Sequence, residues 1–235
     1  MRRYETVILG SGHFALGYAA VRSDTLIVER SYLADAELSG TLGGYMLAGY
    51  APISNEAKEL FEFYRECGIA CEVALDSPLL EVGASAFAKA RGIRYLFGTE
   101  CTDIKKTDEG YEVSLFGNAG FETVFAKRLI DSRPTERSIL RILLRGDRSL
   151  AEEIELSVAS TEVTDAFYDG ECVLCCRLSN ITNANAAKAT ILRELEEKLP
   201  RALRVVQVAP FLGAEDKCAL RRFDEGALSA KESLI

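Results

Sequence analysis

The chain has 235 residues, and its content of 48% hydrophobic and 27% charged residues is ordinary for a globular protein with one large core or two smaller ones. Its 28 basic and 36 acidic residues give a formal net charge of −8, which argues against nucleic acid as the main partner because phosphate binding needs clustered positive charge. No apolar run is long enough to cross a bilayer, so we expect no membrane contact and predict a cytoplasmic protein.

The first thirty residues predict a β-α-β unit. Residues 5–9, "ETVIL", have the length and apolar content of a short buried strand, and a tight turn at Gly10 to Gly12 follows it. "HFALGYAAVR" predicts a helix, and residues 25–29, "TLIVE", predict a second apolar strand. In such a unit the two strands lie parallel and the crossover between them is right-handed.

The next hundred residues predict a long loop, two helices and several strands. Residues 31–54 are rich in Gly, Ser and Ala and have no clean period, which predicts a long functional loop. Apolar residues at three- and four-residue steps then predict helices over 55–68 and 77–91. Residues 93–107 predict one strand leading into another, and residues 110–131 predict a β-hairpin, turning at "GNAG", followed by a strand.

A change of composition after Pro134 marks a second unit. Residues 136–149 predict a basic amphipathic helix, and its arginines are expected to form one solvated face: Arg137, Arg141, Arg145 and Arg148. Strands are predicted within 152–163, 171–179 and 204–210, with a helix over 183–199 between the second and the third. This β-β-α-β order is typical of an α+β layer separate from the first unit.

The seven cysteines predict free thiols, because an odd number does not suit a disulfide framework. Cys172 and Cys175 form a C-x-x-C motif with Cys176 beside it, but the surrounding "ECVLCCRLS" alternates like a buried strand. A redox C-x-x-C needs a helix N-terminus, and zinc needs further ligands that are not found at a suitable spacing. We therefore predict core packing and no metal site, with metal or redox function as the alternative.

A glycine motif follows the first strand. Gly10, Gly12 and Ala15 spell G-x-G-x-x-A, in which the glycines allow a tight turn and a close approach of the backbone to a pyrophosphate at the helix N-terminus. Glu29 ends the second strand, where an acid accepts hydrogen bonds from the adenosine ribose. The helix is about one turn shorter than usual, which keeps its buried face in phase. A Gly12→Val change is expected to abolish dinucleotide binding and to leave the fold intact if Gly12 has ordinary backbone angles.

Four segments, "VILGSGHFA", "LIVER", "GTLGGYM" and "FAKRLID", span about residues 4–133 and resemble FAD-dependent oxidoreductases of the glutathione-reductase-like superfamily. The resemblance implies FAD as the cofactor, with NAD less expected, and a small-molecule substrate. It places Gly10, Gly12 and His13 at the pyrophosphate, Glu29 at the ribose, Gly43 and Gly44 near the flavin, and Cys101 near the adenine. The predicted cofactor-binding set is completed by Phe14, Ala15 and Arg30 from the same segments.

The expected fold class is α/β. A Rossmann-like FAD/NAD(P)-binding domain with a parallel sheet, helices and an antiparallel β-hairpin is predicted over residues 1–135. A smaller α+β substrate or cap domain is predicted over 136–209, and the C-terminal segment 210–235 is free to return to the first domain.

The chain departs from the family at two motifs. "IDSRPTE" stands where family members continue "ID" with "ATG", and no convincing C-terminal Gly-Asp segment follows. The alternative function is therefore a non-catalytic relative that keeps the flavoprotein fold as a binding or assembly module. A partner subunit would supply the missing wall of the cofactor site, which makes a homo-oligomer one expectation.

No catalytic residue is predicted. His13 is the only histidine, and at a helix N-terminus it would stay neutral and donate to a phosphate, unless it merely fills a variable position of the motif. Tyr45 and Tyr50 flank the glycine loop, where flavin contact and core filling are both open. A Ser-His-Asp hydrolase lacks its histidine, and no P-loop motif is present.

Overall fold

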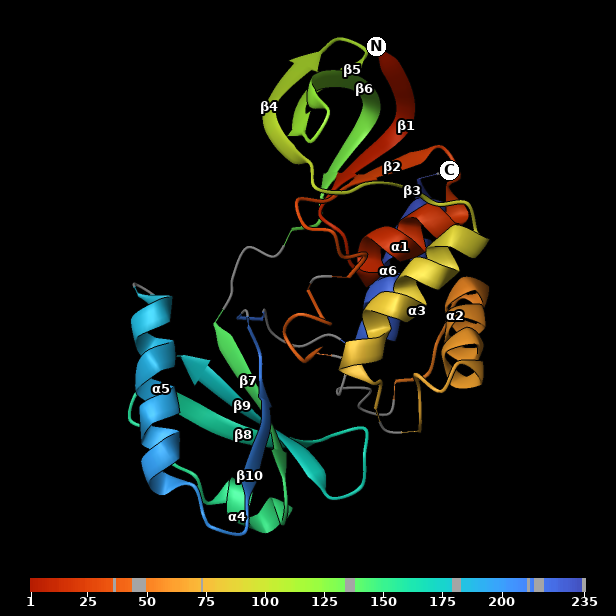
Figure 1. Cartoon of the computed structure of the whole chain (residues 1–235). Helices are drawn as coiled ribbons and strands as arrows, with labels where there is room; N and C mark the ends of the chain where they lie inside the picture. The colour runs from red at the N-terminus through yellow and green to blue at the C-terminus, as the bar shows by residue number, and fades with distance from the viewer. Residues whose placement is uncertain are drawn as a thin grey trace.

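The computed structural model describes residues 1–35, 37–43, 50–72, 74–133, 138–178, 183–210, 212–213 and 218–233. Their strands form two sheets, with most helices gathered beside the first (Figure 1). The elements are β1 (Arg2–Leu9), α1 (His13–Val21), β2 (Thr25–Val28), α2 (Asn55–Glu66), α3 (Ser77–Ala90), β3 (Arg94–Leu96), β4 (Glu100–Thr107), β5 (Gly110–Gly117), β6 (Gly120–Asp131), β7 (Ile139–Arg145), α4 (Arg148–Glu152), β8 (Ala159–Asp165), β9 (Glu171–Leu178), α5 (Ala184–Lys198), β10 (Arg204–Val208) and α6 (Ala219–Glu232).

The predicted β-α-β unit is confirmed. β1 and β2 are adjacent and parallel, with Ile8 opposite Ile27 in the register. All four residues of β2 are buried, as are the last four of β1, and continuous burial is the reason that parallel strands are apolar throughout. The six strands of this sheet run in the order β3-β2-β1-β6-β5-β4, which confirms an α/β fold with a parallel sheet.

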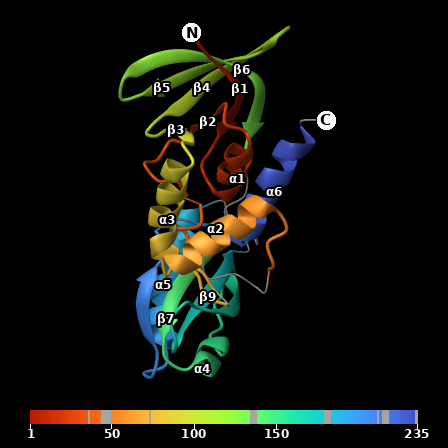
Figure 2. The same cartoon turned by 90° about the vertical axis from the view of Figure 1, so that its right-hand side faces the viewer.

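The predicted β-hairpin is confirmed as well. β5 and β6 pair antiparallel as far as Gly117 and Gly120, so the turn is the "GNAG" segment. β6 is twelve residues long, and from Val124 to Asp131 it pairs parallel with β1, so the hairpin and the parallel strands belong to one sheet. In Figure 2 β4, β5 and β6 lie at one end of the molecule and the second sheet at the other, with α1, α2, α3 and α6 between them.

Helix α6 lies against α1 so closely that two glycines are required at the contact. A Cβ on Gly226 of α6 would collide with the carbonyl group of Phe14, and a Cβ on Gly17 of α1 would collide with that of Phe223. At both positions the neighbouring atoms belong to the backbone, so they cannot move aside to make room for a side chain. The chain therefore comes back, after the second sheet, to complete the helical layer of the first.

The second sheet is wholly antiparallel, with the order β10-β7-β9-β8. It corrects one prediction, because residues 139–145 form strand β7 and not part of a helix over 136–149. Short apolar runs suit a buried helix and a buried strand equally, and here pairing with β9 and β10 on both sides decides the outcome. The prediction that the arginines form one solvated helix face is therefore wrong as well, because Arg141 is buried in the sheet and Arg148 begins the separate helix α4.

The cysteine-rich segment is strand β9, as its alternation predicts. In a strand, residues three apart point to opposite faces, so Cys172 and Cys175 cannot bind one metal or form a disulfide. Both are buried, and burial raises the pKa of Cys176 to about 12, which keeps that thiol protonated. Among the described residues no cluster of His, Cys, Asp and Glu is suited to a metal ion. The prediction of core packing is confirmed.

Candidate functional site

The turn between β1 and α1 needs glycine at two positions. Gly10 and Gly12 have φ angles of 93° and 147°, both in the region that favours glycine. Gly12 is the N-cap of α1, and no side chain caps the helix. The first N–H groups of a helix carry its positive dipole end, which attracts an anion. The turn itself is buried and the φ angle of Gly12 is positive, so the condition of ordinary backbone angles, under which Gly12→Val would leave the fold intact, is not met.

Glu29 follows β2 and lies beside this turn. Its carboxylate accepts hydrogen bonds from the backbone N–H of Ser11 at 2.7 Å and from that of Ser31 at 2.6 Å. The residue is 9% exposed, and its backbone N–H bonds the carbonyl of Leu96 in β3. Each carboxylate oxygen has two lone pairs, so further hydrogen bonds remain available to Glu29. The acid is thus held rigidly at the edge of the sheet, next to the helix N-terminus.

Two more acids face Gly12 from the segment 31–43. A Cβ placed on Gly12 would lie 3.5 Å from Oε2 of Glu37 and 3.7 Å from Oδ1 of Asp35. Burial raises the pKa of Glu37, and Asp35 adds to this shift, while Arg222 of α6, 3.4 Å away, opposes it. The space in front of the uncapped helix is therefore occupied by carboxylates of the protein.

His13 points toward this segment. Its Nδ1 lies 2.7 Å from Oδ2 of Asp35, at an angle that departs from that of a formed hydrogen bond. Its Nε2 lies 2.9 Å from the hydroxyl of Tyr64 in α2, and both partner side chains are buried. Burial raises the pKa of Tyr64 well above its usual value, so the tyrosine stays protonated. In this structure the histidine, at the start of α1, links Asp35 of the segment 31–43 to Tyr64 of α2.

Glu81 of α3 anchors the same segment from the other side. Its two carboxylate oxygens accept the N–H groups of Ala34 at 2.7 Å and of Asp35 at 2.9 Å. Sequence reasoning missed Asp35, Glu37 and Glu81. An acid in a loop rich in Gly, Ser and Ala carries no local signal, and the three meet only because β2, α1 and α3 fold together.

The divergent "IDSR" segment covers the other glycine. A Cβ on Gly10 would lie 2.8 Å from Cγ of Arg133, and the hydroxyl of Ser132 donates to the carbonyl of Gly10 at 3.1 Å. The guanidinium of Arg133 pairs with Asp131 at the end of β6, which raises the pKa of Arg133 and lowers that of Asp131. Arg133 thus lies directly against the glycine turn.

The remaining members of the predicted set are spread around this turn. Ala15 is fully buried in α1, Phe14 is half-buried and Arg30 is exposed. Gly43 lies against Leu38, because a Cβ there would be 2.7 Å from Cδ2 of that leucine. Cys101 is a half-buried residue of β4 whose thiol pKa is raised by burial. Gly44 and Tyr45 lie outside the described residues.

Tyr50 is a structural contact. Its hydroxyl donates to Asp224 of α6 at 2.9 Å, and the same carboxylate accepts the N–H groups of Ile53 at 2.8 Å and Ser54 at 2.7 Å. Burial, with Asp224 beside it, raises the pKa of Tyr50 far above its usual value. Asp224 thus joins the start of α2 to α6, a role that sequence reasoning also missed.

Comparison with known proteins identifies the fold. No protein-family model matches the chain, and no curated protein matches it. Among solved structures, p-nitrophenol 4-monooxygenase from Pseudomonas putida is 14% identical, with a TM-score of 0.60, and the match covers 98% of this chain and 78% of that one. The myxobacterial chondrochloren halogenase, an FAD-dependent halogenase, is 10% identical with a TM-score of 0.57 over 90% and 62% of the chains.

A geranylgeranyl bacteriochlorophyll reductase-like protein from Thermoplasma acidophilum is 13% identical with a TM-score of 0.56, over 98% of this chain and 78% of that one. The chain therefore has the FAD-binding, Rossmann-like flavoprotein fold. Its structural neighbours are FAD-dependent monooxygenases, halogenases and reductases, so the flavoprotein part of the resemblance is confirmed and the narrower glutathione-reductase-like grouping stays a prediction. No helix in the described part of the chain is both long and apolar enough to span a membrane.

Proposed function

We propose that this protein is an FAD-binding oxidoreductase that acts on a small molecule. The observation that carries the proposal is the position of Glu29, which is fixed at the end of β2 beside the uncapped N-terminus of α1. An acid there is suited to the adenosine ribose, and a helix N-terminus is suited to the pyrophosphate. When bound, FAD would supply the electron transfer, so that the protein needs few acids or bases of its own.

The residues fit the two halves of the nucleotide differently. The adenosine end fits without change, because Glu29 keeps free lone pairs toward the ribose hydroxyls. The pyrophosphate end fits only after Asp35 and Glu37 withdraw from Gly12, since two carboxylates within van der Waals contact of that position would oppose an anion. FAD binding is therefore coupled to a movement of the segment 31–43, which Glu81 and His13 hold in place.

A flavin titration tests the proposal. The purified protein is titrated with FAD, ADP and FMN, and binding is followed by flavin fluorescence or by calorimetry. We expect Glu29→Gln to weaken FAD and ADP about tenfold, because charge-assisted hydrogen bonds to the ribose are lost, and to leave FMN, which lacks the adenosine, unchanged. Glu109→Gln, an exposed acid at the β4–β5 turn, is the matched control. FAD binding that is indifferent to Glu29 would contradict the proposal.

A second function has specific support in the two acids at Gly12 and in Arg133 at Gly10. A relative that no longer binds FAD would keep the fold as a binding or assembly module, and its own side chains would occupy the place of the nucleotide. This function is favoured if neither the protein nor a Glu37→Gln variant binds FAD while both melt cooperatively. A homo-oligomer, detected by sedimentation, would favour an assembly role and would supply a wall for the site.

A further inference from the structure

The segment 31–43 packs into two different apolar cores. Leu38 is buried in the core formed by α1, α2, α3 and α6 beside the first sheet. Leu42, four residues later, is 1% exposed and is buried in the core of the second sheet. Every other described member of that second core comes from residues 139–212. Figure 1 shows the segment, in orange, between the helices and the second sheet, so one short stretch of chain joins the two cores.

Hydrogen bonds make the end of this segment a compact turn. The N–H of Gly43 donates to the carbonyl of Leu38 at 2.8 Å, and the hydroxyl of Thr41 donates to the carbonyl of Glu37. The side chain of Leu38 fills the space beside Gly43, where a Cβ would lie 2.7 Å from its Cδ2. The residues on either side of Leu42 are thus tied back to Glu37 and Leu38.

The backbone of Leu42 is held in an unfavourable conformation. Its φ angle is 55°, and among the described residues no other side-chain-bearing residue has a positive φ. A Cβ makes this region costly, so the conformation persists only where the surroundings hold it. Burial in the second core is such a constraint. Without it Leu42 is expected to relax to a negative φ, which turns the chain on either side.

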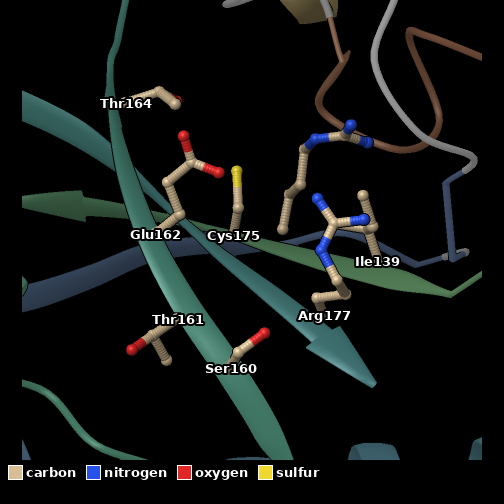
Figure 3. A pocket seen from close by; sticks show the side chains of 8 residues that line it. Ile139, Ser160, Thr161, Glu162, Thr164, Cys175 and Arg177 are labelled. Carbon is tan, nitrogen blue, oxygen red and sulfur yellow. The ribbon is translucent and has the colours of Figure 1, made fainter. Parts of the chain in front are cut away.

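Thr41 contacts the second sheet where β7 begins. A Cβ on Gly213 would lie 3.2 Å from Cβ of Thr41. The N–H of Gly213 donates to the carbonyl of Ile139 at 2.8 Å, and the N–H of Ile139 donates to the carbonyl of Gly213 at 3.1 Å. Ile139 pairs with Arg177 of β9 at this end of the sheet (Figure 3). The Ile139–Gly213 bridge therefore reports whether the turn still lies against the sheet.

We propose that the segment 31–43 couples the nucleotide site to the second sheet, so that its release from Gly12 and its release from the second core are one movement. Glu81 anchors one end, and the core around Leu42 anchors the other. Coupling is reciprocal, so whatever loosens one end favours release of the other. The inference rests on the proposed function in one respect, because FAD is the ligand that would displace the segment from the glycine turn. The second sheet would thereby sense whether the nucleotide site is filled.

Hydrogen exchange, resolved by NMR for single N–H groups, tests the coupling without any nucleotide. Leu42→Ala should speed exchange at Ala34 and Asp35, at the opposite end of the segment, at least about tenfold. Leu195→Ala is the matched control, because Leu195 is buried in the same core but belongs to α5. It should loosen the second core and leave the N–H groups of Ala34 and Asp35 protected.

Glu81→Ala tests the coupling in the reverse direction. It removes the acceptor at the nucleotide end, and it should speed exchange at Ile139 and Gly213 in the second sheet. Ser85→Ala is the control, since Ser85 donates to the same carboxylate without contacting the segment.

A milder variant serves if Leu42→Ala does not fold. Thr41→Ala removes the hydrogen bond to Glu37 and the methyl group that faces Gly213. It should also speed exchange at Ala34 and Asp35, by a smaller factor.

A titration with FAD completes the experiment. Saturating FAD should speed exchange at Ile139 and Gly213 in the unchanged protein, and Leu42→Ala should bind FAD about three- to tenfold more tightly. The inference is overturned if a folded Leu42→Ala protein keeps Ala34 and Asp35 as protected as in its parent, or if bound FAD leaves exchange at Ile139 and Gly213 unchanged.

Glu81→Ala supplies a further outcome that would overturn the coupling, namely faster exchange at Ala34 and Asp35 with none at Ile139 and Gly213. A protein that does not bind FAD at all would refute the proposed function instead. Exchange in Leu42→Ala and Glu81→Ala, measured without nucleotide, would still decide whether the two ends of the segment are coupled.

Discussion

Glu37 faces Gly12 at the N-terminus of α1, with Oε2 only 3.5 Å from the position that a Cβ would take on the glycine. A helix that has no capping side chain thus has an acid of its own chain in front of it. The raised pKa of Glu37 means that its ionised form is disfavoured there, chiefly by burial. The same acid that stands in front of the helix end in this structure opposes a pyrophosphate at that end.

The first prediction concerns this charge. Glu37→Gln should raise the affinity for FAD about three- to tenfold near neutral pH, because a negative charge facing the pyrophosphate is removed. In the unchanged protein the affinity should rise as the pH falls through the raised pKa of Glu37, since its carboxyl becomes protonated in that direction. The variant should show a smaller dependence, and FAD titrations at several pH values measure both.

The groups around Glu37 define the control for this prediction. Asp35 raises its pKa, and Arg222 and His13 lower it. The pH dependence that survives in Glu37→Gln therefore comes from other groups and is subtracted from that of the unchanged protein. An affinity that is unchanged by Glu37→Gln at every pH would show that the acid leaves the site before FAD enters.

The second prediction concerns the anchor of the segment 31–43. Glu81→Ala should speed hydrogen exchange at the N–H groups of Ala34 and Asp35, because both lose their acceptor. It should also raise the affinity for FAD, since the segment then moves away at lower cost. Ser85→Ala is the control, because Ser85 donates to the same carboxylate without contacting the segment. Slow exchange in Glu81→Ala would mean that other contacts hold the segment.

The third prediction concerns Asp224. Burial favours its neutral form, but the hydrogen bonds from Ser54, Ile53 and Tyr50 outweigh burial and hold the pKa of Asp224 below its usual value. Asp224→Asn should lower the free energy of unfolding by about 1–3 kcal/mol at neutral pH, because an amide N–H would face a backbone N–H. Urea denaturation measures this loss.

The pH dependence gives the sign of the Asp224 contribution. A depressed folded-state pKa adds stability above the unfolded value, and this stability is lost as the pH falls through the folded pKa. The difference in the free energy of unfolding between Asp224→Asn and the unchanged protein should therefore become smaller at acid pH. Glu225→Gln, whose surface pair with Arg221 spans 3.6 Å, should cost far less. Equal costs for the two substitutions would refute a special role for Asp224.

The fourth prediction concerns the glycine contact between α1 and α6. Gly226→Ala should destabilise the protein by at least about 1–3 kcal/mol, because the new methyl group meets the backbone of Phe14, which cannot move without shifting the helix. Leu228→Ala, on the exposed side of α6, is the control. Thermal melts compare the two, and a Gly226→Ala protein as stable as its parent would mean that the helices separate easily.

Local sequence determined much of the fold. The β-branched residues of the short "TVIL" and "TLIV" runs favour strands, and "GNAG" favours a hairpin turn, and all three belong to the six-stranded sheet. Strand β7 was not predictable in this way, because "ILRILLR" is apolar enough for a buried helix, and only the neighbours β9 and β10 make it a strand.

Of the candidate site, only the glycine turn and the position of Glu29 could be predicted from the sequence. The glycines and Glu29 have a spacing that local geometry explains, so their proximity could be expected. Asp35 and Glu37 could not be, because their place depends on Glu81 and His13, which hold the segment against α1. For the same reason, a Gly12→Val substitution no longer tests dinucleotide binding alone. With a φ of 147° in a buried turn, any side chain at Gly12 strains the fold as well as the binding site.

The pairing of α1 with α6 has a consequence for synthesis on the ribosome. Residues Phe14 and Gly17 emerge early, but Phe223 and Gly226 follow about two hundred residues later, after the whole second sheet. At the elongation rates of roughly 5–20 residues per second, this interval lasts on the order of ten seconds or more. Throughout it the apolar surface of α1 that α6 will cover remains open to chaperones or to other nascent chains. Helix α1, and the glycine turn before it, therefore gain the support of α6 only when that helix has been synthesised.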